Sequence, residues 1–295
     1  MTHALSGLVL QQCGLRKRFS ILIIFLSTLA PDLDYLTRIW GADLLLRYHR
    51  GITHGILVLF LFPLFMAFLF RKKTGFAYAY GLSLLGYGLH ILMDLTNQYG
   101  TRVLSPLDWN QYSLDLTFII DPYITGGLLL AVAMRWINPR RAQVFALCAV
   151  LLLSGYLAGK SYLQDRAKEF LKTKVDAQVY RLYPLPNDFL RWWFITKLNN
   201  EVSTGFADLF TQRVCIQEKY SLDRHDSLIQ ASEKTRVIRN FLSFARYPYA
   251  EVKKEGERTV VTWKDLAYSF LPGERVTAKV VMDGQGEVIS SKFRF

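Results

Sequence analysis

Histidine and aspartate residues stand beside long apolar runs in the first part of this 295-residue chain. The stretch YHRGITHG places His49 and His54 five residues apart, directly before an apolar run. The stretch PDLD places Asp32 and Asp34 one residue apart, directly after another apolar run, and the proline biases the preceding backbone towards an extended or turn conformation. Imidazole nitrogens and carboxylate oxygens bind metals and carry protons, so the two stretches are candidates for one chemical site.

A third pair lies inside an apolar run. His90 and Asp94 are separated by four residues in LHILMD, so on a helix both side chains share a face and can reach one ion. Ionisable groups within a membrane-spanning run are energetically expensive and usually functional. Asn97 and Thr101 follow in TNQYGT, where they could orient ligands or contact a substrate.

Each motif also has a structural explanation. PDLD could be a solvated loop or a helix cap, and a histidine at a helix start could simply pack. His90 and Asp94 could form an ordinary hydrogen bond. Thr53 is a natural N-cap for the helix that follows, and Gly51 permits a close approach of the backbone to a ligand.

The composition predicts a multi-pass membrane protein. Up to Gly159 the only acidic residues are seven aspartates, and the other 17 of the 24 acidic residues follow it. A bilayer crossing needs about 20 apolar residues, and a cleaved signal peptide would account for only one apolar region. The candidate spans are Ile52–Phe70, Phe76–Leu95, Leu116–Met134 and Ala142–Ala158, with a shorter run at Phe19–Ala30.

The net charge of +12 does not indicate nucleic-acid binding, because the basic residues cluster at the ends of apolar runs. This placement is typical of cytoplasmic flanks under the positive-inside rule. The clusters are Arg16-Lys17-Arg18, Arg71-Lys72-Lys73 and Arg135 with Arg140-Arg141.

With these clusters in the cytoplasm, the polar motifs come to the opposite face of the membrane. Asp32 and Asp34, His49 and His54, and His90 and Asp94 all stand at outer ends of the predicted spans. A short helix over Thr2–Gly14 would add His3. Asp115 also lies outside, and Asp121 falls in the first turn of the next span. The charge pattern therefore predicts a site at the outer face of the membrane.

The combined side chains form a mixed nitrogen and oxygen ligand set. Such a set suits zinc, with manganese or iron as alternatives, and seven ligands fit two or three ions better than one. Metal-activated water supports phosphoester hydrolysis, with Asp32 or Asp34 as general base and Arg50 contacting the phosphate. The candidate ligands are His3, Asp32, Asp34, His49, His54, His90 and Asp94; candidate substrate contacts are Arg50, Asn97 and Thr101, with Asp115 and Asp121 as secondary candidates.

The remainder of the chain has a different character. A charged stretch at Lys160–Lys174 predicts a helix leaving the membrane, and turn signals such as Asp283-Gly284 separate strand-like runs beyond it. We expect a helical membrane domain at 1–159, a connecting helix at 160–176 and a small β-rich extracytoplasmic domain at 177–295. The expected strands are Val179–Tyr183, Trp192–Ile195, Val214–Glu218, Thr259–Trp263, Val276–Met282 and Val288–Phe293. The three cysteines, Cys13, Cys148 and Cys215, have no metal-like spacing and are read as free or buried.

The motifs in their order resemble the YdjM-like membrane-bound metal-dependent hydrolases of bacteria. The resemblance rests on HALSG, PDLDYL, HRGITHG and GLHILMDLTNQYGTRVLSP, and it covers roughly residues 1–125. That family is regarded as a distant relative of zinc-dependent phospholipase C. The resemblance implies a metal role for the seven candidate ligands, a phosphate contact for Arg50, and a location in a bacterial inner membrane with the site on the periplasmic side. Gly55 departs from the family, in which many members have a small hydroxyl residue after the second histidine.

Three functions follow from these observations. The first is a metal-dependent hydrolase of a phosphoester in a membrane lipid or lipid-linked substrate. The alternatives are a metal-ion transporter and a membrane anchor in which the metal is only structural. Transporter sites tend towards the middle of the membrane, whereas these polar residues stand at the ends of the apolar runs. Convergence of the seven candidate ligands in space is the first requirement of the hydrolase hypothesis.

Overall fold

The computed structural model describes residues 1–15, 17–222 and 226–294. Arg16, which belongs to the first basic cluster, lies outside the described residues. The chain divides into two compact units. The helical unit comprises Met1–Tyr35, His49–Leu163 and Pro184–Asn187, and the C-terminal unit comprises Leu36–Tyr48, Gln164–Tyr183 and Asp188–Phe295.

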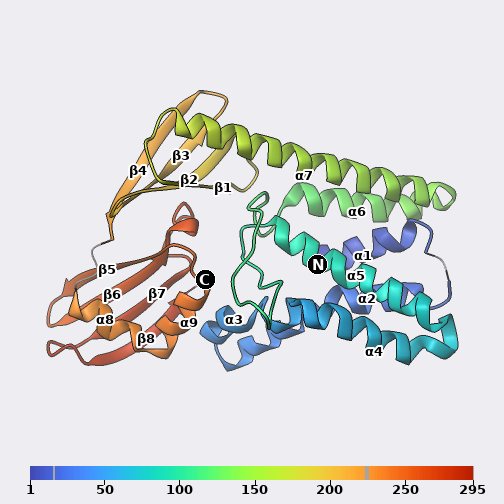
Figure 1. Ribbon diagram of the computed structural model, residues 1–295, viewed down its shortest axis with the longest axis horizontal. Coiled ribbons are helices and arrows are strands. Elements are labelled where there is room, and N and C mark those ends of the chain that lie inside the picture. Colours follow the sequence, from blue (N-terminus) through green and yellow to red (C-terminus); the bar gives the residue numbers. More distant parts are fainter. Residues whose placement is uncertain (16, 223–225, 295) are drawn as a thin grey trace. The chain divides into compact units, whose positions relative to one another are not determined.

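The helical unit is built around α4 and α5, which lie side by side and are joined at Gly75 (Figure 1). Gly75 has a φ of 88°, a conformation that favours glycine, so the chain reverses there between two helices. One apolar core packs α2 against α4 and α5 through Ile23, Ile24 and Met66. The helices are α1 (Thr2–Gln12), α2 (Ser20–Leu29), α4 (Ile56–Thr74), α5 (Phe76–Thr96), α6 (Pro122–Ile137) and α7 (Ala142–Lys172), with 3-10 helices at Pro31–Trp40, Ile52–His54 and Pro139–Arg141.

Several helices are long and apolar enough to cross a membrane. By length and composition, Phe76–Thr96 and Pro139–Lys172 qualify among the described residues. The count rises to four if two bent pairs each form one span: Ser20–Leu29 with Pro31–Trp40, and Ala42–His54 with Ile56–Thr74. Pro122–Ile137 is a shorter apolar helix.

The expected helix over Leu116–Met134 is wrong at its start. Residues 116–121 are not helical, and α6 begins only at Pro122. Proline is well suited to the first helical position, and the Asp121 carboxylate accepts hydrogen bonds from the backbone N–H groups of Tyr123 and Ile124. Asp121 is therefore the N-cap of the helix and not part of its first turn.

The fourth apolar run and the charged stretch after it form one helix. α7 continues without a break from Ala142 to Lys172, so the predicted connecting helix is an extension of the predicted span. No residue between Ala158 and Lys160 is a proline, and the i to i−4 hydrogen-bond ladder has no reason to end there.

The C-terminal unit contains α3 and two four-stranded antiparallel sheets, ordered β1-β2-β3-β4 and β5-β6-β7-β8 (Figure 1). All six expected strands exist, whereas β3 and β5 were not expected. β3 carries Gly205 beside a bulge and has little apolar alternation, so its strand character comes from pairing with β2 and β4. The elements are α3 (Ala42–Tyr48), β1 (Val179–Pro184), β2 (Arg191–Leu198), β3 (Glu201–Asp208), β4 (Arg213–Ser221), α8 (Ser227–Glu233), α9 (Arg236–Phe244), β5 (Pro248–Glu255), β6 (Arg258–Asp265), β7 (Thr277–Met282) and β8 (Val288–Arg294).

Helices α8 and α9 pack on the second sheet, α8 against β5 and β6 and α9 against β7 and β8. Fully buried aromatic side chains such as Trp192, Trp263 and Phe241 fill the interior of the unit. The predicted fold class, apolar helices followed by a β-rich C-terminal region, is confirmed. Cys13, Cys148 and Cys215 are all free thiols.

Candidate metal centre

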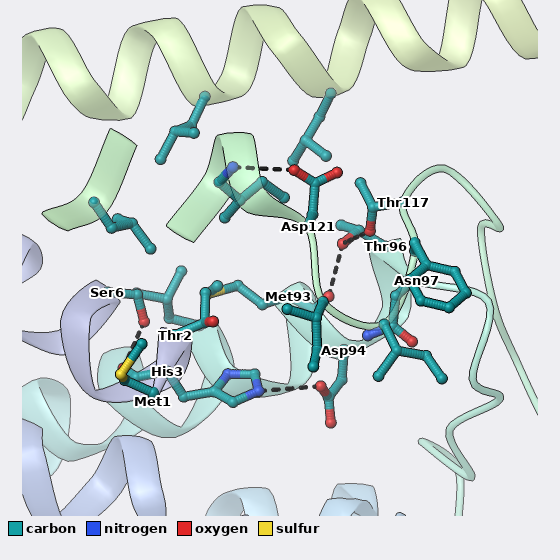
Figure 2. Close-up of a pocket in the computed structure, with 18 of the residues that line it drawn as sticks. Met1, Thr2, His3, Ser6, Met93, Asp94, Thr96, Asn97, Thr117 and Asp121 are labelled. Carbon is teal, nitrogen blue, oxygen red and sulfur yellow. Dashed lines mark hydrogen bonds and ion pairs between the residues drawn. The ribbon is translucent and has the colours of Figure 1, made fainter. Parts of the chain in front are cut away.

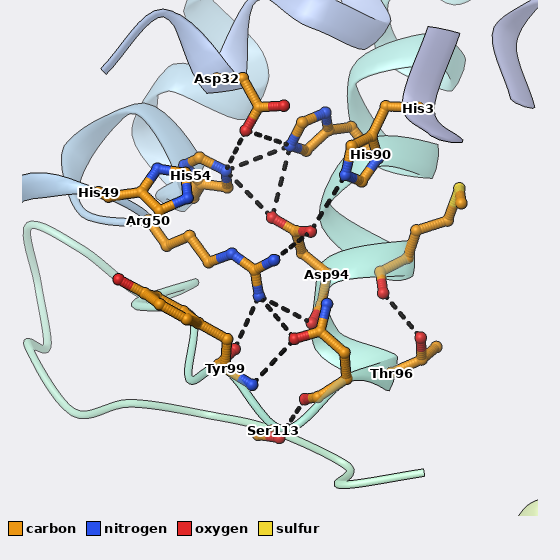
Figure 3. Close-up of polar contacts among 12 residues, drawn as sticks. His3, Asp32, His49, Arg50, His54, His90, Asp94, Thr96, Tyr99 and Ser113 are labelled. Atoms are coloured by element: carbon orange, nitrogen blue, oxygen red, sulfur yellow. Dashed lines mark hydrogen bonds and ion pairs between the residues drawn. The ribbon is translucent and has the colours of Figure 1, made fainter. Parts of the chain in front are cut away.

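The seven predicted ligands converge in the helical unit, together with Arg50; all of them except Asp34 are labelled in Figure 3. We refer to these eight residues as the His/Asp cluster. They come from four parts of the chain: α1, the 3-10 helix after α2, the segment that leads into α4, and the last two turns of α5. Pairs that are far apart in sequence, such as His3 with Asp94 and His90 with Asp32, are in direct contact.

One group of potential ligands consists of Asp32, His54 and His90. The Nε2 atoms of His54 and His90 are 3.2 Å apart. Asp32 Oδ1 lies 3.9 Å from the first nitrogen and 3.6 Å from the second. Ligands that bind zinc at about 2.0–2.1 Å stand roughly 3.3 Å apart at tetrahedral angles. Two imidazoles and a carboxylate with these separations fit three positions of a tetrahedral site.

The hydrogen bonds behind the two rings decide which nitrogen faces the group. His90 Nδ1 is 2.7 Å from the carbonyl oxygen of Thr28, which can only accept. His54 Nδ1 is 3.3 Å from Asp34 Oδ2. His90 therefore donates through Nδ1, and its Nε2 is turned towards His54 Nε2 and the Asp94 carboxylate.

A second group consists of His3, His90 and Asp94. His3 Nε2 lies 3.2 Å from Asp94 Oδ1, and its ring stacks on that of His90 with centroids 3.7 Å apart. Burial lowers the pKa of His3, and the contact with Asp94 opposes this effect. His90 belongs to both groups but has one free nitrogen, so only one ion at a time can be held through it.

Asp94 connects the two groups. Its Oδ2 lies 3.1 Å from His54 Nε2 and 3.4 Å from His90 Nε2, whereas its Oδ1 faces His3. The side chain is 1% exposed. A carboxylate with its two oxygens facing different sets of ring nitrogens is suited to bridge two ions.

Asp34 supports the rings and does not line the cavity beside them. Its carboxylate accepts hydrogen bonds from the Arg50 backbone N–H at 3.0 Å and the Thr53 hydroxyl at 2.6 Å, and it contacts His49 Nδ1 at 2.7 Å. Burial alone would raise the pKa of Asp34, but the hydrogen bonds with His49 and His54 hold it below its ordinary value. Asp34 is therefore a poor proton acceptor, and of the two predicted bases Asp32 is the one that faces the cavity.

The predicted capping role of Thr53 is wrong. Gly55 is the N-cap residue of α4, and the Thr53 hydroxyl donates to Asp34 instead. The absence of a side chain at residue 55 also has a local cause. A Cβ atom there would collide with the hydroxyl and carbonyl oxygens of Ser105, and the Ser105 hydroxyl donates to the Gly51 carbonyl.

Arg50 holds Asp94 in place. Its Nη2 lies 2.8 Å from Asp94 Oδ1, and its Nη1 donates to Asn97 Oδ1 at 2.9 Å and to the Tyr99 carbonyl at 2.7 Å. The guanidinium also lies over the Tyr99 ring, 4.7 Å from its centroid. Both terminal nitrogens contact protein acceptors, so Arg50 orients Asp94, and Arg50 also lines the cavity beside the cluster.

The remaining predicted residues differ in whether they line the cavity. Asn97 lines the cavity and fixes Arg50. Thr101 is fully buried, does not line the cavity, and pairs through its backbone with Tyr112. Asp115 accepts a hydrogen bond from the Ser113 hydroxyl and also does not line the cavity. Asp121 lines the cavity as the cap of α6.

Sequence reasoning missed three supporting groups: the Thr28 carbonyl, the Tyr87 hydroxyl and the Tyr99 ring. Tyr87 donates to the Thr53 carbonyl, which holds the backbone between the two histidines of HRGITH. Tyr99 packs against both Arg50 and His49. A sequence does not show which backbone carbonyl will accept a hydrogen bond from a histidine. Two tyrosines within apolar stretches, however, could have been recognised as candidates for polar contacts with the site.

A cavity of about 660 Å³ opens beside the cluster (Figure 2). His3, Asp32, His49 and Asp94 line it, so potential ligands face a space large enough for a small molecule. Most of its other lining residues are apolar and come from α1, α5, α6 and α7.

Comparison with known proteins assigns the two parts of the chain separately. The profile of the YdjM inner membrane protein family matches residues 1–164, and that of the YfhP C-terminal alpha/beta plait domain matches residues 227–295. Uncharacterized protein YfhP of Bacillus subtilis (strain 168) is 28% identical over 251 residues, which are 81% of this chain and 74% of the relative. No solved structure matches. The first match includes the whole His/Asp cluster, and the second coincides with α8, α9 and β5 to β8.

Proposed function

We propose that this chain, which belongs to the YdjM inner membrane protein family, is an integral-membrane metal-dependent hydrolase. Its substrate is a phosphoester in a membrane lipid or lipid-linked molecule. The observation that carries the proposal is the group formed by Asp32, His54 and His90, whose ligand atoms face one another beside a cavity. This group has the ligand types of a catalytic metal site.

Zinc suits the donor set best, with manganese or iron as alternatives. Asp32, His54 and His90 would hold one ion, and His3 with Asp94 would contribute to a second. Asp94 would bridge the two through its separate oxygens. When bound, such cations lower the pKa of water and polarise the phosphoryl oxygens.

The protein's own groups then move the proton. Asp32 is the base because its side chain is 38% exposed and lines the cavity, while its contacts with His54 and His90 are made through Oδ1 (Figure 3). It takes a proton from the attacking water as the new P–O bond forms, and the proton passes to the leaving oxygen as the old P–O bond breaks. Asp34 and Arg50 keep His54 and Asp94 in position throughout.

The orientation of the site is part of the proposal. Arg71, Lys72 and Lys73 lie in the last turn of α4, whereas His49 and His54 precede its first turn. Arg140 and Arg141 follow the C-terminal end of α6, whose N-terminal end is capped by Asp121. If those clusters are cytoplasmic, the His/Asp cluster faces the periplasm. There it would meet lipid headgroups without a separate docking step.

The test combines metal analysis with phosphoester turnover in the full chain purified in detergent micelles. We expect the purified protein to contain zinc or another divalent metal and to hydrolyse a phosphomonoester or phosphodiester. His54→Ala should lose metal and at least about 100-fold in turnover, because it removes a ligand and not an outer partner. Asp108→Asn, a change at an exposed carboxylate that does not line the cavity, is the matched control.

Stoichiometric metal without turnover of any phosphoester would overturn the hydrolase proposal and leave a metal-binding membrane anchor. Retention of metal by His54→Ala would remove this residue from the ligand set.

A further inference from the structure

We propose that the cavity beside the His/Asp cluster is a binding site for one apolar chain of the substrate, with the phosphoester held at its polar end. This inference rests on the proposed function and adds the part of the substrate that the site recognises. It also assigns a role to α6 and α7, which supply no residue to the His/Asp cluster.

The apolar wall comes from one face of each of four helices. On α7 the lining residues Val150, Leu153, Ser154 and Leu157 follow helical spacing. α1 contributes Val9 and Leu10, α5 contributes Leu89 and Met93, and α6 contributes Ile124 and Leu128. On α7 the lining positions span seven residues, which at a rise of about 1.5 Å per residue corresponds to a depth of roughly 10 Å.

The ionisable lining residues gather at one end of this space. His3 and Asp94 lie in contact, and Thr2 Oγ1 is 3.1 Å from Thr125 Oγ1 in the first turn of α6. That contact brings the Asp121 cap to the same end. Among the described lining residues of α6 and α7, none beyond Asp121 is charged. The cavity is therefore polar at one end and apolar along its length.

The polar end and the apolar wall together indicate which kind of ligand fits the cavity. Val150, on the apolar wall that α7 contributes, is 42% exposed in the bare protein. A hydrocarbon chain matches the chemistry of this wall. An acyl or alkyl chain covers this surface, and a phosphoester at the end of that chain lies against the candidate metal ligands. A water-soluble phosphoester would leave the apolar wall uncovered.

The experiment places a large side chain into the cavity from α7. Val150→Trp places a large ring into the cavity, and Leu151→Trp is the matched control, because Leu151 is the next residue, is 72% exposed and does not line the cavity. Metal-loaded protein in micelles is assayed with lysophosphatidic acid, which has one acyl chain, and with p-nitrophenyl phosphate, which has none. We expect Val150→Trp to lower the ratio of lipid to soluble-ester turnover at least tenfold, and Leu151→Trp to leave the ratio unchanged.

A binding measurement separates this inference from the proposed function. Native mass spectrometry with added lysophosphatidic acid reports retention of the lipid whether or not it is hydrolysed. We expect wild type and Leu151→Trp to retain one lipid and Val150→Trp to retain none. If wild type hydrolyses neither ester yet shows this pattern, the hydrolase proposal fails and the chain-binding site stands. If Val150→Trp changes neither the turnover ratio nor lipid retention, the chain-binding site is overturned while the hydrolase proposal stands.

Discussion

Two buried aspartates, one in each unit, are satisfied in opposite ways. Asp265 in the C-terminal unit is 1% exposed and accepts hydrogen bonds from the backbone N–H groups of Arg246, Tyr247 and Ala267. Asp94 in the helical unit is equally buried, but its contacts are ion pairs with Arg50 and three histidine rings. Within the described part of the chain, neither Asp94 oxygen has a well-formed hydrogen bond.

The difference separates a structural carboxylate from one placed for a ligand. The backbone groups around Asp265 belong to the segment between α9 and β5 and to the 3-10 helix Leu266–Tyr268 after β6, so the aspartate fixes the structure where these segments meet. The Asp94 oxygens face the Nε2 atoms of three histidines, and carboxylate oxygens and imidazole nitrogens together form a donor set suited to a cation. Burial of a carboxylate alone does not indicate a site; the nature of its partners does.

The largest expected effect contrasts two histidines of the cluster. His90→Ala removes the one ring common to both ligand groups, so we expect loss of bound metal and a fall in turnover beyond about 100-fold. His49→Ala removes a ring that is in neither group and contacts Asp34, so we expect a loss of about 10–100-fold. Metal content by mass spectrometry and initial rates check both. Equal losses from the two variants would show that His49 is also a direct ligand.

The next effect concerns the stability of the helical unit. Arg50→Met keeps the length of the side chain but leaves Asp94 without its cation. Removing one partner of a buried ion pair typically destabilises by about 3–5 kcal/mol, so we expect a loss of this size in metal-free protein. Chemical unfolding in micelles with a chelator present measures it. Added metal should recover part of the loss in Arg50→Met, and a variant as stable as wild type in the chelator would show that Arg50 does not support Asp94.

A smaller effect is expected at the structural aspartate. Asp265→Ala leaves buried N–H groups without an acceptor, at about 1–3 kcal/mol for an unsatisfied group. The loss should lower the unfolding midpoint of the C-terminal unit, while metal content and turnover per folded molecule stay at the wild-type level. A variant that lost metal as well would contradict the separation between the two carboxylates.

The smallest effect is expected for a surface pair. Lys219 Nζ lies 2.8 Å from a Glu201 carboxylate oxygen, and both side chains are more than half exposed. Exposed ion pairs contribute about 0–1 kcal/mol, so Glu201→Ala should change the free energy of unfolding by less than about 1 kcal/mol. A larger loss of unfolding free energy would show that this pair contributes more to stability than exposed ion pairs do.

Much of the architecture could be predicted from local sequence alone. Apolar runs longer than a helical turn, interrupted by Gly75 and basic clusters, indicated most of the helices, and alternating β-branched and aromatic residues indicated six strands. The spacing of His90 and Asp94 placed both on one helix face for the same reason, since helical periodicity is a local property. The missed strands β3 and β5 have little apolar alternation, and pairing with neighbours makes them strands.

The amino-acid sequence by itself determined which residue types the cluster contains and that His90 and Asp94 face the same way. The tertiary structure decided what each residue contacts. Asp32 faces the cavity and Asp34 supports the rings. Arg50 binds Asp94, and the Thr53 hydroxyl donates to Asp34 instead of capping a helix. The two aspartates of PDLD are chemically identical and one residue apart, so only the groups packed around each one distinguish them. Those groups come from segments distant in sequence, and no local pattern can specify them.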